Sequence, residues 1–193
     1  MRGKSFPKFV VEHLEVKMYP WCVLEYKHIS KKVGKKRLLF TNIKSGGKKL
    51  EKIGEVKKES VKTLGLTKAC VLDPSATKTL TPTIAKRFSY FIFGGILGDN
   101  PQRFRTKKFL SSKLKFPTYN LGKKQMSTDT AVIVCKKIIE GQSLKDMKFK
   151  DGYEIEEEPG FFRELPYRYL IEKNKVIFTP GLKTLLKKLG HKL

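Results

Sequence analysis

SYFIFGGILGDNP, at residues 89–101, is the stretch on which the interpretation of the whole chain depends. Its apolar run at residues 90–93 is rich in aromatic and β-branched residues and too short for a helix, so it predicts a strand buried on both faces. Gly94 and Gly95 end the run, as expected where another group approaches the backbone closely or where φ turns positive. Asp99 follows in a Gly-Asp-Asn-Pro turn, which would place a carboxylate at the carboxyl end of the strand. Ligands bind at that end of open α/β sheets, although an ordinary glycine-rich turn after a core strand explains the same pattern.

Length and composition indicate a globular protein of ordinary size. The 193 residues suffice for one domain with a short appendage, and 39% hydrophobic residues can form a real core. No run of about 18 apolar residues and no leader-like segment occurs, so we expect neither a membrane span nor secretion, and a cytoplasmic location. Cys22, Cys70 and Cys135 are far apart and form no Cys-x-x-Cys pair. They are typical of small core residues in a reducing compartment rather than of disulfides or a metal site.

The charge is strongly positive, with a formal net charge of +24. Such an excess predicts a polyanionic neighbourhood, most simply RNA or a ribosomal surface. The chain has only three glutamines and four asparagines, which is typical of heat-adapted proteins. Heat adaptation adds glutamate as well as lysine, so it does not explain the imbalance. Between residues 102 and 128 there are eight basic residues and no acidic one: Arg103, Arg105, Lys107, Lys108, Lys113, Lys115, Lys123 and Lys124. A solvated helix usually mixes signs, so this stretch is the best candidate for a phosphate-facing surface.

Strand and helix patterns alternate along most of the chain. Strands are expected at residues 8–13, 37–43, 69–73, 90–93 and 116–121. Helices are expected at residues 20–33, 59–64, 82–88, 105–114 and from Ser127 or Thr128 to a C′ glycine at Gly141. The alternation predicts an α/β fold, a mostly parallel sheet with helices on both faces. Beyond Gly141 we expect an appendage with a locally acidic segment at residues 151–158, a β-hairpin formed by residues 165–170 and 175–178, and a terminal helix from about Pro180.

Several common enzyme classes lack their motifs here. The glycines Gly94, Gly95 and Gly98 do not have the Gly-x-Gly-x-x-Gly spacing of a dinucleotide site and follow a late strand. No P-loop lysine motif and no Gly-x-Ser-x-Gly elbow occurs, and the three histidines have no metal-ligand spacing. Phosphoryl transfer, hydride transfer and triad hydrolysis are therefore disfavoured.

Three stretches carry a resemblance to a known family. They are VLDPS at residues 71–75, FIFGGILGDNP at 91–101 and NLGKKQMSTDTA at 120–131. They resemble the SPOUT methyltransferases, and more narrowly a small archaeal and eukaryotic group of S-adenosylmethionine-dependent RNA methyltransferase-like proteins. Eukaryotic members of that group methylate an arginine of a small-subunit ribosomal protein. The resemblance extends over nearly the whole chain.

The resemblance implies a C-terminal trefoil knot in the sheet and a cofactor bound by three loops at the ends of three strands. The knot would lie in about residues 69–141 of a SPOUT domain at 1–141, with residues 142–193 packed on it as a C-terminal extension. S-adenosylmethionine would contact Leu72, Asp73, Pro74, Phe93, Gly94, Gly95, Ile96, Leu97, Leu121, Gly122, Lys124, Gln125, Met126, Thr128 and Thr130. Backbone groups recognise most of adenine and ribose, which suits glycine-rich irregular loops.

The acceptor stays open at this point between a ribosomal protein arginine and ribosomal or transfer RNA. Methyl transfer is an in-line displacement, so the protein must align the acceptor and keep it unprotonated. Asp99 and Asp129 are the candidate catalytic carboxylates, with Glu12 and Glu15 behind them. Each aspartate is equally explained as a turn former or a helix-end charge. No metal is expected; a monomer and a homodimer are both compatible with the sequence, and a non-catalytic ribosome-binding module is the alternative function.

Overall fold

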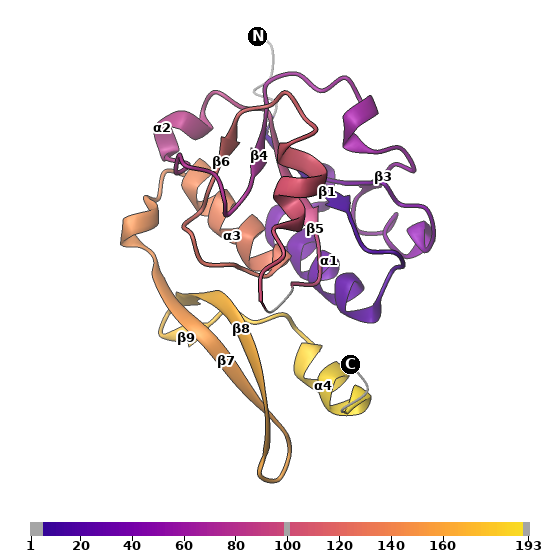
Figure 1. The fold of residues 1–193 in the computed structure, drawn as a ribbon, viewed down its shortest axis with the longest axis vertical. Helices are drawn as coiled ribbons and strands as arrows, with labels where there is room; N and C mark the ends of the chain where they lie inside the picture. The colour runs from indigo at the N-terminus through magenta and orange to yellow at the C-terminus, as the bar shows by residue number, and fades with distance from the viewer. Residues whose placement is uncertain (1–5, 99–100, 191–193) are drawn as a thin grey trace.

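A computed structural model describes residues 6–98 and 101–190 (Figure 1). Its main layer is a six-stranded sheet of order β3-β2-β1-β5-β4-β6 in which every pair of neighbours is parallel. The strands are β1 (Lys8–His13), β2 (Leu38–Thr41), β3 (Glu55–Val56), β4 (Ala69–Leu72), β5 (Tyr90–Gly95) and β6 (Thr118–Tyr119). The predicted parallel α/β sheet is confirmed, and all strands end at the same edge. The trefoil knot stays a prediction.

The two faces of the sheet are covered differently. Phe9, Val11 and Phe91 point to the face that packs against α1 (Pro20–Val33) and α3 (Thr128–Ile139). Val10 and Ile92 point to the other face, which a 3-10 turn (Val61–Thr63) and a π-helical turn (Lys107–Ser111) cover. Alternate residues of a strand face opposite sides, so β1 and β5 are buried on both faces, as their continuous apolar pattern predicts.

Helix α1 has the bounds that the sequence predicts. Pro20 occupies its first turn, where the missing N–H costs nothing, and Gly34 follows its end with φ 88°. Thr81 likewise caps α2 (Pro82–Ala85) by accepting a hydrogen bond from the Ile84 N–H at 3.3 Å. Gly141 has φ 102°, as its predicted place after α3 requires.

Other expectations for the main layer are wrong in detail. The helix expected at residues 59–64 is the single 3-10 turn Val61–Thr63, and the basic helix expected at 105–114 is interrupted by the π-helical turn Lys107–Ser111. The strands expected at 37–43 and 116–121 are the shorter β2 and β6. These segments lie at turns of the fold, where the few apolar positions fit a short turn as well as a helix.

A second, antiparallel sheet of order β7-β8-β9 follows α3. The hairpin expected from two segments at 165–178 is confirmed in β8 (Phe161–Glu172) and β9 (Lys175–Val176), and α4 (Leu182–Leu189) is the expected terminal helix. The acidic segment at 151–158, predicted only as part of an appendage, belongs to the strand β7 (Lys148–Glu158). Glutamates are unusual in strands, which is why the pattern does not predict it. The predicted division at residue 141 falls between the two sheets.

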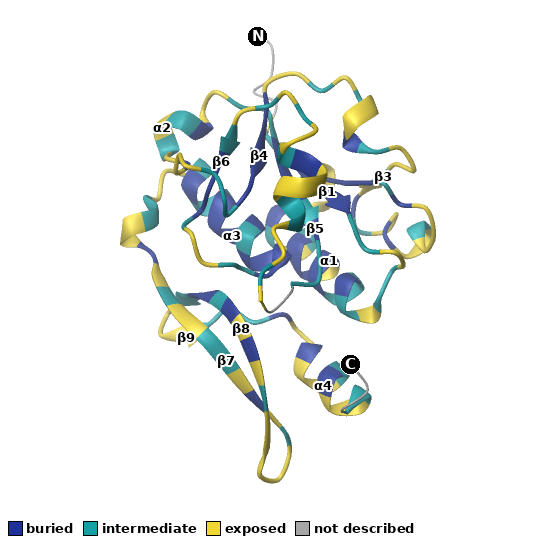
Figure 2. Cartoon of the chain, in the orientation of Figure 1, coloured by how far each residue is buried: buried dark blue, intermediate teal, exposed yellow. Residues whose placement is uncertain are grey.

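The second sheet packs on the main layer through α1 and α3. Trp21 and Leu24 of α1 contact the cluster formed by Tyr169 of β8 and by Leu182 and Leu186 of α4. Figure 2 shows the far end of the β7–β8 hairpin projecting from the body with mostly exposed residues. In the described part of the chain no helix is long and apolar enough to cross a membrane.

Candidate functional site

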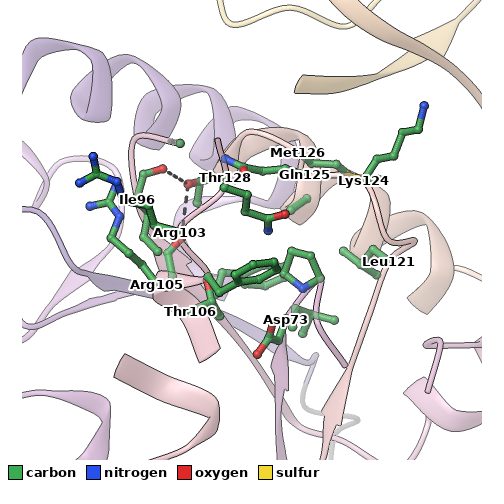
Figure 3. Close-up of a pocket in the computed structure, with 18 of the residues that line it drawn as sticks. Asp73, Ile96, Arg103, Arg105, Thr106, Leu121, Lys124, Gln125, Met126 and Thr128 are labelled. Atoms are coloured by element: carbon green, nitrogen blue, oxygen red, sulfur yellow. Dashed lines mark hydrogen bonds between the residues drawn. The ribbon is translucent and has the colours of Figure 1, made fainter. Parts of the chain in front are cut away.

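A cleft opens at the carboxyl edge of the main sheet, beyond β4, β5 and β6 (Figure 3). It contains about 770 Å³ of empty space, part of which is open to solvent. Arg103 and Arg105 lie on one side of the view and Leu121 on the other. Four chain segments line the cleft: Leu72, Asp73 and Pro74; Phe93, Gly94, Ile96 and Gly98; Gln102, Arg103, Phe104, Arg105 and Thr106; and Leu121, Gly122, Lys124, Gln125, Met126, Thr128 and Ala131.

Buried polar side chains hold the loops after β4 and β6 in place. The Asp73 carboxylate accepts hydrogen bonds from the Ser75 N–H at 2.8 Å, the Ser75 hydroxyl at 2.7 Å and the Ser111 hydroxyl at 2.5 Å. The Asn120 amide donates to the Ala76 carbonyl at 2.8 Å, and its oxygen accepts from the Gly122 N–H at 3.0 Å. Asn120 therefore connects the loop after β4 to the loop after β6.

The loop after β5 is fixed by a carboxylate from outside the cleft lining. Glu15 accepts a hydrogen bond from the Leu97 N–H at 2.8 Å and from Arg105 Nη1 at 2.9 Å, and Arg105 Nη2 donates to the Leu97 carbonyl. From the other side, the Thr128 hydroxyl lies 3.4 Å from the carbonyl oxygens of Gly94 and Ile96, as the dashed lines of Figure 3 mark. Side chains from two other parts of the chain thus hold the backbone of this loop.

The two glycines at the end of β5 face opposite sides. A Cβ at Gly94 would lie 2.9 Å from the Thr106 hydroxyl, within the cleft lining. A Cβ at Gly95 would lie 2.3 Å from the Tyr26 hydroxyl, in the core beneath α1. Both positions are approached closely, as predicted, and neither has a positive φ. The absence of a side chain at Gly94 therefore leaves space in the cleft, whereas its absence at Gly95 leaves space for core side chains.

Twelve of the fifteen predicted cofactor contacts line the cleft. The three that do not are Gly95, Leu97 and Thr130. Leu97 is held by the contacts of its backbone with Glu15 and Arg105 described above. The Thr130 side chain is buried, and its hydroxyl lies 2.8 Å from the Ser127 hydroxyl. Gly95 follows Gly94 on β5 and so faces the opposite side of the sheet, and Thr130 lies on the buried side of α3.

Asp129 lies beneath the cleft, outside its lining, and only 2% of its surface is exposed. Its carboxylate lies 2.7 Å from His28 Nδ1 and accepts from the hydroxyls of Thr179 at 2.6 Å and Ser127 at 2.7 Å. Burial opposes its ionisation, but these hydrogen bonds and the charge of His28 hold the pKa of Asp129 below its usual value. Such contacts are those of a structural carboxylate that joins α1, α3 and the segment before α4. They also explain why Ser127, the residue before α3, does not cap the helix with its side chain.

The other candidate carboxylates are placed as follows. Asp99 lies outside the described residues, next to Gly98 of the cleft. Glu12 is buried and accepts from the hydroxyls of Thr41 and Ser60, each at 2.5 Å, and from the Val61 N–H at 2.9 Å. Glu12 therefore fixes the ends of β1 and β2 rather than facing the cleft.

Glu25 is a buried carboxyl group that the sequence does not single out. Trp21 Nε1 donates to it at 2.9 Å, and burial together with the negative charge of Asp129 raises the pKa of Glu25 well above its usual value. No sequence pattern distinguishes Glu25 from an exposed glutamate of an amphipathic helix.

The sequence does not assign Gly98, Gln102, Phe104, Thr106 and Ala131 to the cofactor site. The signal that could have indicated residues 102–106 is their closeness in sequence to the predicted second loop, which ends at Leu97. Phe104 has φ 49°, an uncommon conformation for a large side chain, and stays 53% exposed beside the cleft.

For Arg103 and Arg105 the sequence leaves open a contact with a phosphate or with a cofactor carboxylate. Arg103 is exposed and makes no ion pair with any described residue.

The second sheet contacts the cleft loop that follows β6. The Arg168 N–H donates to the Gln125 carbonyl at 2.8 Å, and Arg168 pairs with Met126 in a parallel bridge. Asp151 of β7 accepts from Arg168 Nε at 2.7 Å and from Lys124 Nζ at 2.8 Å. The Tyr167 hydroxyl donates to the Gly98 carbonyl at 2.9 Å. β8 thus contacts two of the loops that form the cleft.

A second pocket adjoins the cleft and shares Gln102, Lys124 and Gln125 with it. Its remaining lining comes from Lys123, Asp151, Gly152, Glu164, Pro166, Tyr167 and Arg168. The exposed face of the β7–β8 hairpin continues from this pocket, where Glu154 lies directly opposite Glu164 and Glu156 opposite Phe162. Neither Glu154 nor Glu164 makes an ion pair with a described residue.

Within residues 6–98 and 101–190 no cluster of histidine, cysteine and carboxylate side chains is arranged to bind a metal.

Known proteins match the chain over nearly its full length. Residues 8–192 match the family model described as protein arginine N-methyltransferase SFM1-like. The chain is 37% identical over 204 residues to the protein arginine N-methyltransferase SFM1 of Saccharomyces cerevisiae, covering 94% of each. The crystal structure of the yeast arginine methyltransferase SFM1 complexed with SAM superposes with a TM-score of 0.85 at 34% identity, over 95% of this chain and 91% of that one.

A more distant structure supports the fold alone. The dual specific Trm10 from Thermococcus kodakaraensis has a TM-score of 0.56 at 15% identity, over 73% of this chain and 96% of that one. Because the family model and the yeast relative both extend over most of the sequence, the chain belongs to the SFM1-like family of protein arginine N-methyltransferases.

Proposed function

We propose that this S-adenosylmethionine-dependent protein arginine methyltransferase acts on an arginine of a basic protein, such as a ribosomal protein. Use of the cofactor follows from the family, and the cleft is consistent with it. The yeast relative has been solved with SAM and with SAH, and the cleft in this chain has the residues that such a ligand needs.

The cleft fits the cofactor in both shape and chemistry. Leu72, Leu121 and Met126 supply apolar walls for adenine, and backbone groups of the three loops supply hydrogen bonds. Arg103 has a guanidinium available for the carboxylate of the amino-acid part. When bound, S-adenosylmethionine supplies an electrophilic methyl group on a sulfonium. The chain must then align the acceptor and exclude water.

The observation that carries the choice of a basic protein is a pair of glutamates on the exposed hairpin face beside the second pocket. Glu154 and Glu164 face each other across the hairpin, and like charges in that position repel. A cationic segment docked on this face would relieve the repulsion, whereas RNA phosphates would increase it. The exposed Phe162 at the end of the same face would add an apolar contact.

Asp99 is the carboxylate that we assign to the acceptor. A guanidinium has a pKa above about 12, so an arginine loses its proton only as the methyl group is transferred. Gly98 and Gln102, on either side of Asp99 in sequence, both line the cleft. Asp99 would orient the guanidinium and accept the proton, while Asp129 would maintain the base of the cleft.

Labelled methyl transfer to isolated small ribosomal subunits tests the proposal. We expect the tritiated methyl groups transferred from S-adenosylmethionine to stay in macromolecular material after nuclease digestion and to be released by protease digestion. Mass spectrometry should then find them on methylarginine. Label that survives protease but not nuclease would establish RNA as the acceptor. Cofactor binding without any transfer to ribosomal components would favour a non-catalytic binding module.

A charge-matched pair of variants tests the acidic face. Glu154→Gln with Glu164→Gln should raise the KM for the protein substrate, while the affinity for S-adenosylmethionine stays unchanged. The control is Glu51→Gln with Glu59→Gln, two exposed glutamates near β3 at the far edge of the main sheet. Equal effects of the two double variants on KM would show that overall charge, rather than this face, determines substrate binding.

A further inference from the structure

The strands of the main sheet also share an amino edge, at the opposite end from the cleft. Because all six strands are parallel, the residues that precede them gather along this edge. Most are basic and exposed: Lys35 and Lys36 before β2, Lys68 before β4, Lys86 and Arg87 before β5, and Lys113 and Lys115 before β6. We call these residues, with Phe6 and Arg37, the amino-edge surface.

Backbone contacts link the neighbouring parts of this surface. The Lys8 N–H donates to the Ser89 carbonyl at 2.8 Å, and the Ser89 N–H donates to the Lys68 carbonyl at 2.7 Å. Arg37 Nε donates to the Pro7 carbonyl at 3.2 Å. The starts of β2, β1, β5 and β4 are therefore adjacent, and their cations belong to one surface rather than to separate loops.

The carboxylates at this edge are already paired. Glu55, at the start of β3, accepts from Lys8 Nζ at 3.0 Å, and Glu140, whose charge acts on Arg37, lies 2.6 Å from Lys136 Nζ. No ion pair joins Lys35, Lys36, Lys68 or Lys86 to any described residue. The amino-edge surface thus has a positive charge that the rest of the described chain does not neutralise.

An exposed aromatic ring lies within this positive surface. Phe6 is 72% exposed, and the Arg37 guanidinium lies 5.6 Å from the centre of its ring. Arg37 is also 5.1 Å from the ring of Phe9 in the core, which fixes the guanidinium between the two rings. A cationic surface with an exposed ring suits single-stranded nucleic acid, because phosphates contact the cations while a base stacks on the ring.

We propose that the amino-edge surface binds single-stranded RNA. The inference goes beyond the proposed methyl transfer and does not depend on it, since the surface lies at the opposite end of the sheet from the cleft. RNA held there would leave the cleft and the hairpin face with Glu154 and Glu164 accessible to a protein. The enzyme would in this way be retained on an RNA-rich particle while it acts on an arginine.

Charge reversal with a matched control tests the phosphate contacts. The probe is a uridine-rich single-stranded RNA of about 20 nucleotides, whose affinity is measured by fluorescence anisotropy across a salt series. Lys35→Glu with Lys36→Glu should weaken binding at low salt at least tenfold and lower the slope of log affinity against log salt by about 1.4 or less. Lys187→Glu with Lys188→Glu, two exposed lysines of α4 near the other end of the molecule, should change the affinity less than threefold.

Substitution of the exposed ring tests base stacking. Phe6→Ala should weaken binding of the single strand by roughly 5- to 100-fold, with little effect on a duplex of the same length. Phe162→Ala, which removes a similarly exposed ring at the acidic hairpin, is the control.

Three results would overturn the proposal: no measurable RNA binding at low salt, equal losses in the two lysine double variants, or equal losses in the two phenylalanine variants. S-adenosylmethionine binding by each variant, measured by calorimetry, shows that the protein is folded. The test of methyl transfer is independent of whether the protein binds RNA.

Discussion

At the scale of single residues, the consecutive glycines Gly94 and Gly95 have different tasks. Gly94 keeps Thr106 and the cleft lining free of a methyl group, whereas Gly95 leaves room for the hydroxyl of Tyr26. Tyr26 is in turn fixed by His13, whose Nδ1 lies 2.8 Å from that hydroxyl. A substitution at Gly94 should therefore affect ligand binding in the cleft, and a substitution at Gly95 should affect stability.

Gly94→Ala and Gly95→Ala form the corresponding pair of variants. We expect Gly95→Ala to lower the free energy of unfolding by about 1–3 kcal/mol, as overpacking of a core does. The folded fraction should bind S-adenosylmethionine normally. Gly94→Ala should weaken that binding with little change in stability, since flexible side-chain ends oppose the new methyl group. Denaturant titration and calorimetry measure the two quantities, and an exchange of the two phenotypes would contradict the assignment of faces.

The buried carboxyl of Glu25 makes stability depend on pH. Its pKa in the folded protein lies well above the ordinary value of 4.5, because burial and Asp129 disfavour the charged form. The unfolded chain therefore releases this proton at lower pH than the folded protein does. The contribution of Glu25 to stability is complete below about pH 4.5 and is lost as the pH rises towards the folded-state pKa.

Glu25→Gln should remove that loss. Relative to the unmodified protein, the variant should gain stability between pH 5 and pH 8, because the amide does not ionise. The melting temperature of both proteins at several pH values measures the difference. A constant difference across the range would mean that Glu25 is ionised in the folded protein.

At the scale of elements, the important contact is between β8 and the loop after β6. Asp151 holds Lys124 and Arg168 together, and these contacts keep the pKa of Asp151 below its usual range. Exposed ion pairs contribute little to global stability. Their effect here is to fix the position of residues 124–126, which line the cleft.

Asp151→Asn should therefore weaken cofactor binding several-fold while changing the free energy of unfolding by less than about 1 kcal/mol. Glu55→Gln is a suitable control, because Glu55 has a similar exposure and also accepts from a lysine. Calorimetric titration with S-adenosylmethionine should separate the two variants. Equal affinities would show that the loop is held by the backbone hydrogen bond from Arg168 alone.

At the scale of the whole molecule, the two sheets act as one unit around the cleft. The Arg168 N–H donates to Gln125, and Tyr167 donates to Gly98, so two cleft loops depend on a strand of the second sheet. The charges are separated along the molecule, with the acidic hairpin at one end and the amino-edge surface at the other. The proposed protein substrate and the proposed RNA would therefore bind at opposite ends of the molecule.

Hydrogen exchange tests whether the sheets are coupled. A saturating cofactor at about 100 times its Kd should stabilise the native state by about 2.7 kcal/mol. If the sheets open together, exchange at the amide of Arg168 should slow by the same factor as exchange at Ile92 in the centre of β5. Protection of Ile92 without protection of Arg168 would show that the second sheet opens independently.

Local pattern in the sequence is sufficient for the parallel sheet and for the position of the site. The types of side chain at neighbouring positions, as in residues 90–95, are enough to predict each strand. Parallel strands then bring their carboxyl ends to one edge of the sheet. That reasoning puts the turns after the predicted strands at one edge. The assignment of Leu72, Gly94 and Met126 to a cofactor site comes from the resemblance, and all three line the cleft. The narrower expectation of an arginine methyltransferase comes from resemblance rather than from composition or spacing.

The direction of individual side chains, and the partners of residues far apart in sequence, depend on tertiary packing. Asp129 lies 101 positions from His28, and Asp151 lies 27 from Lys124. Their proximity follows from how α1, α3 and β7 pack, which no local pattern specifies. The strand β7 is not predicted for the same reason. Its glutamates have a low strand propensity, and pairing with β8 and the packing of Ile155 and Tyr153 stabilise it. Long-range packing outweighs local preference at these places because each nonlocal contact depends on the whole fold being formed.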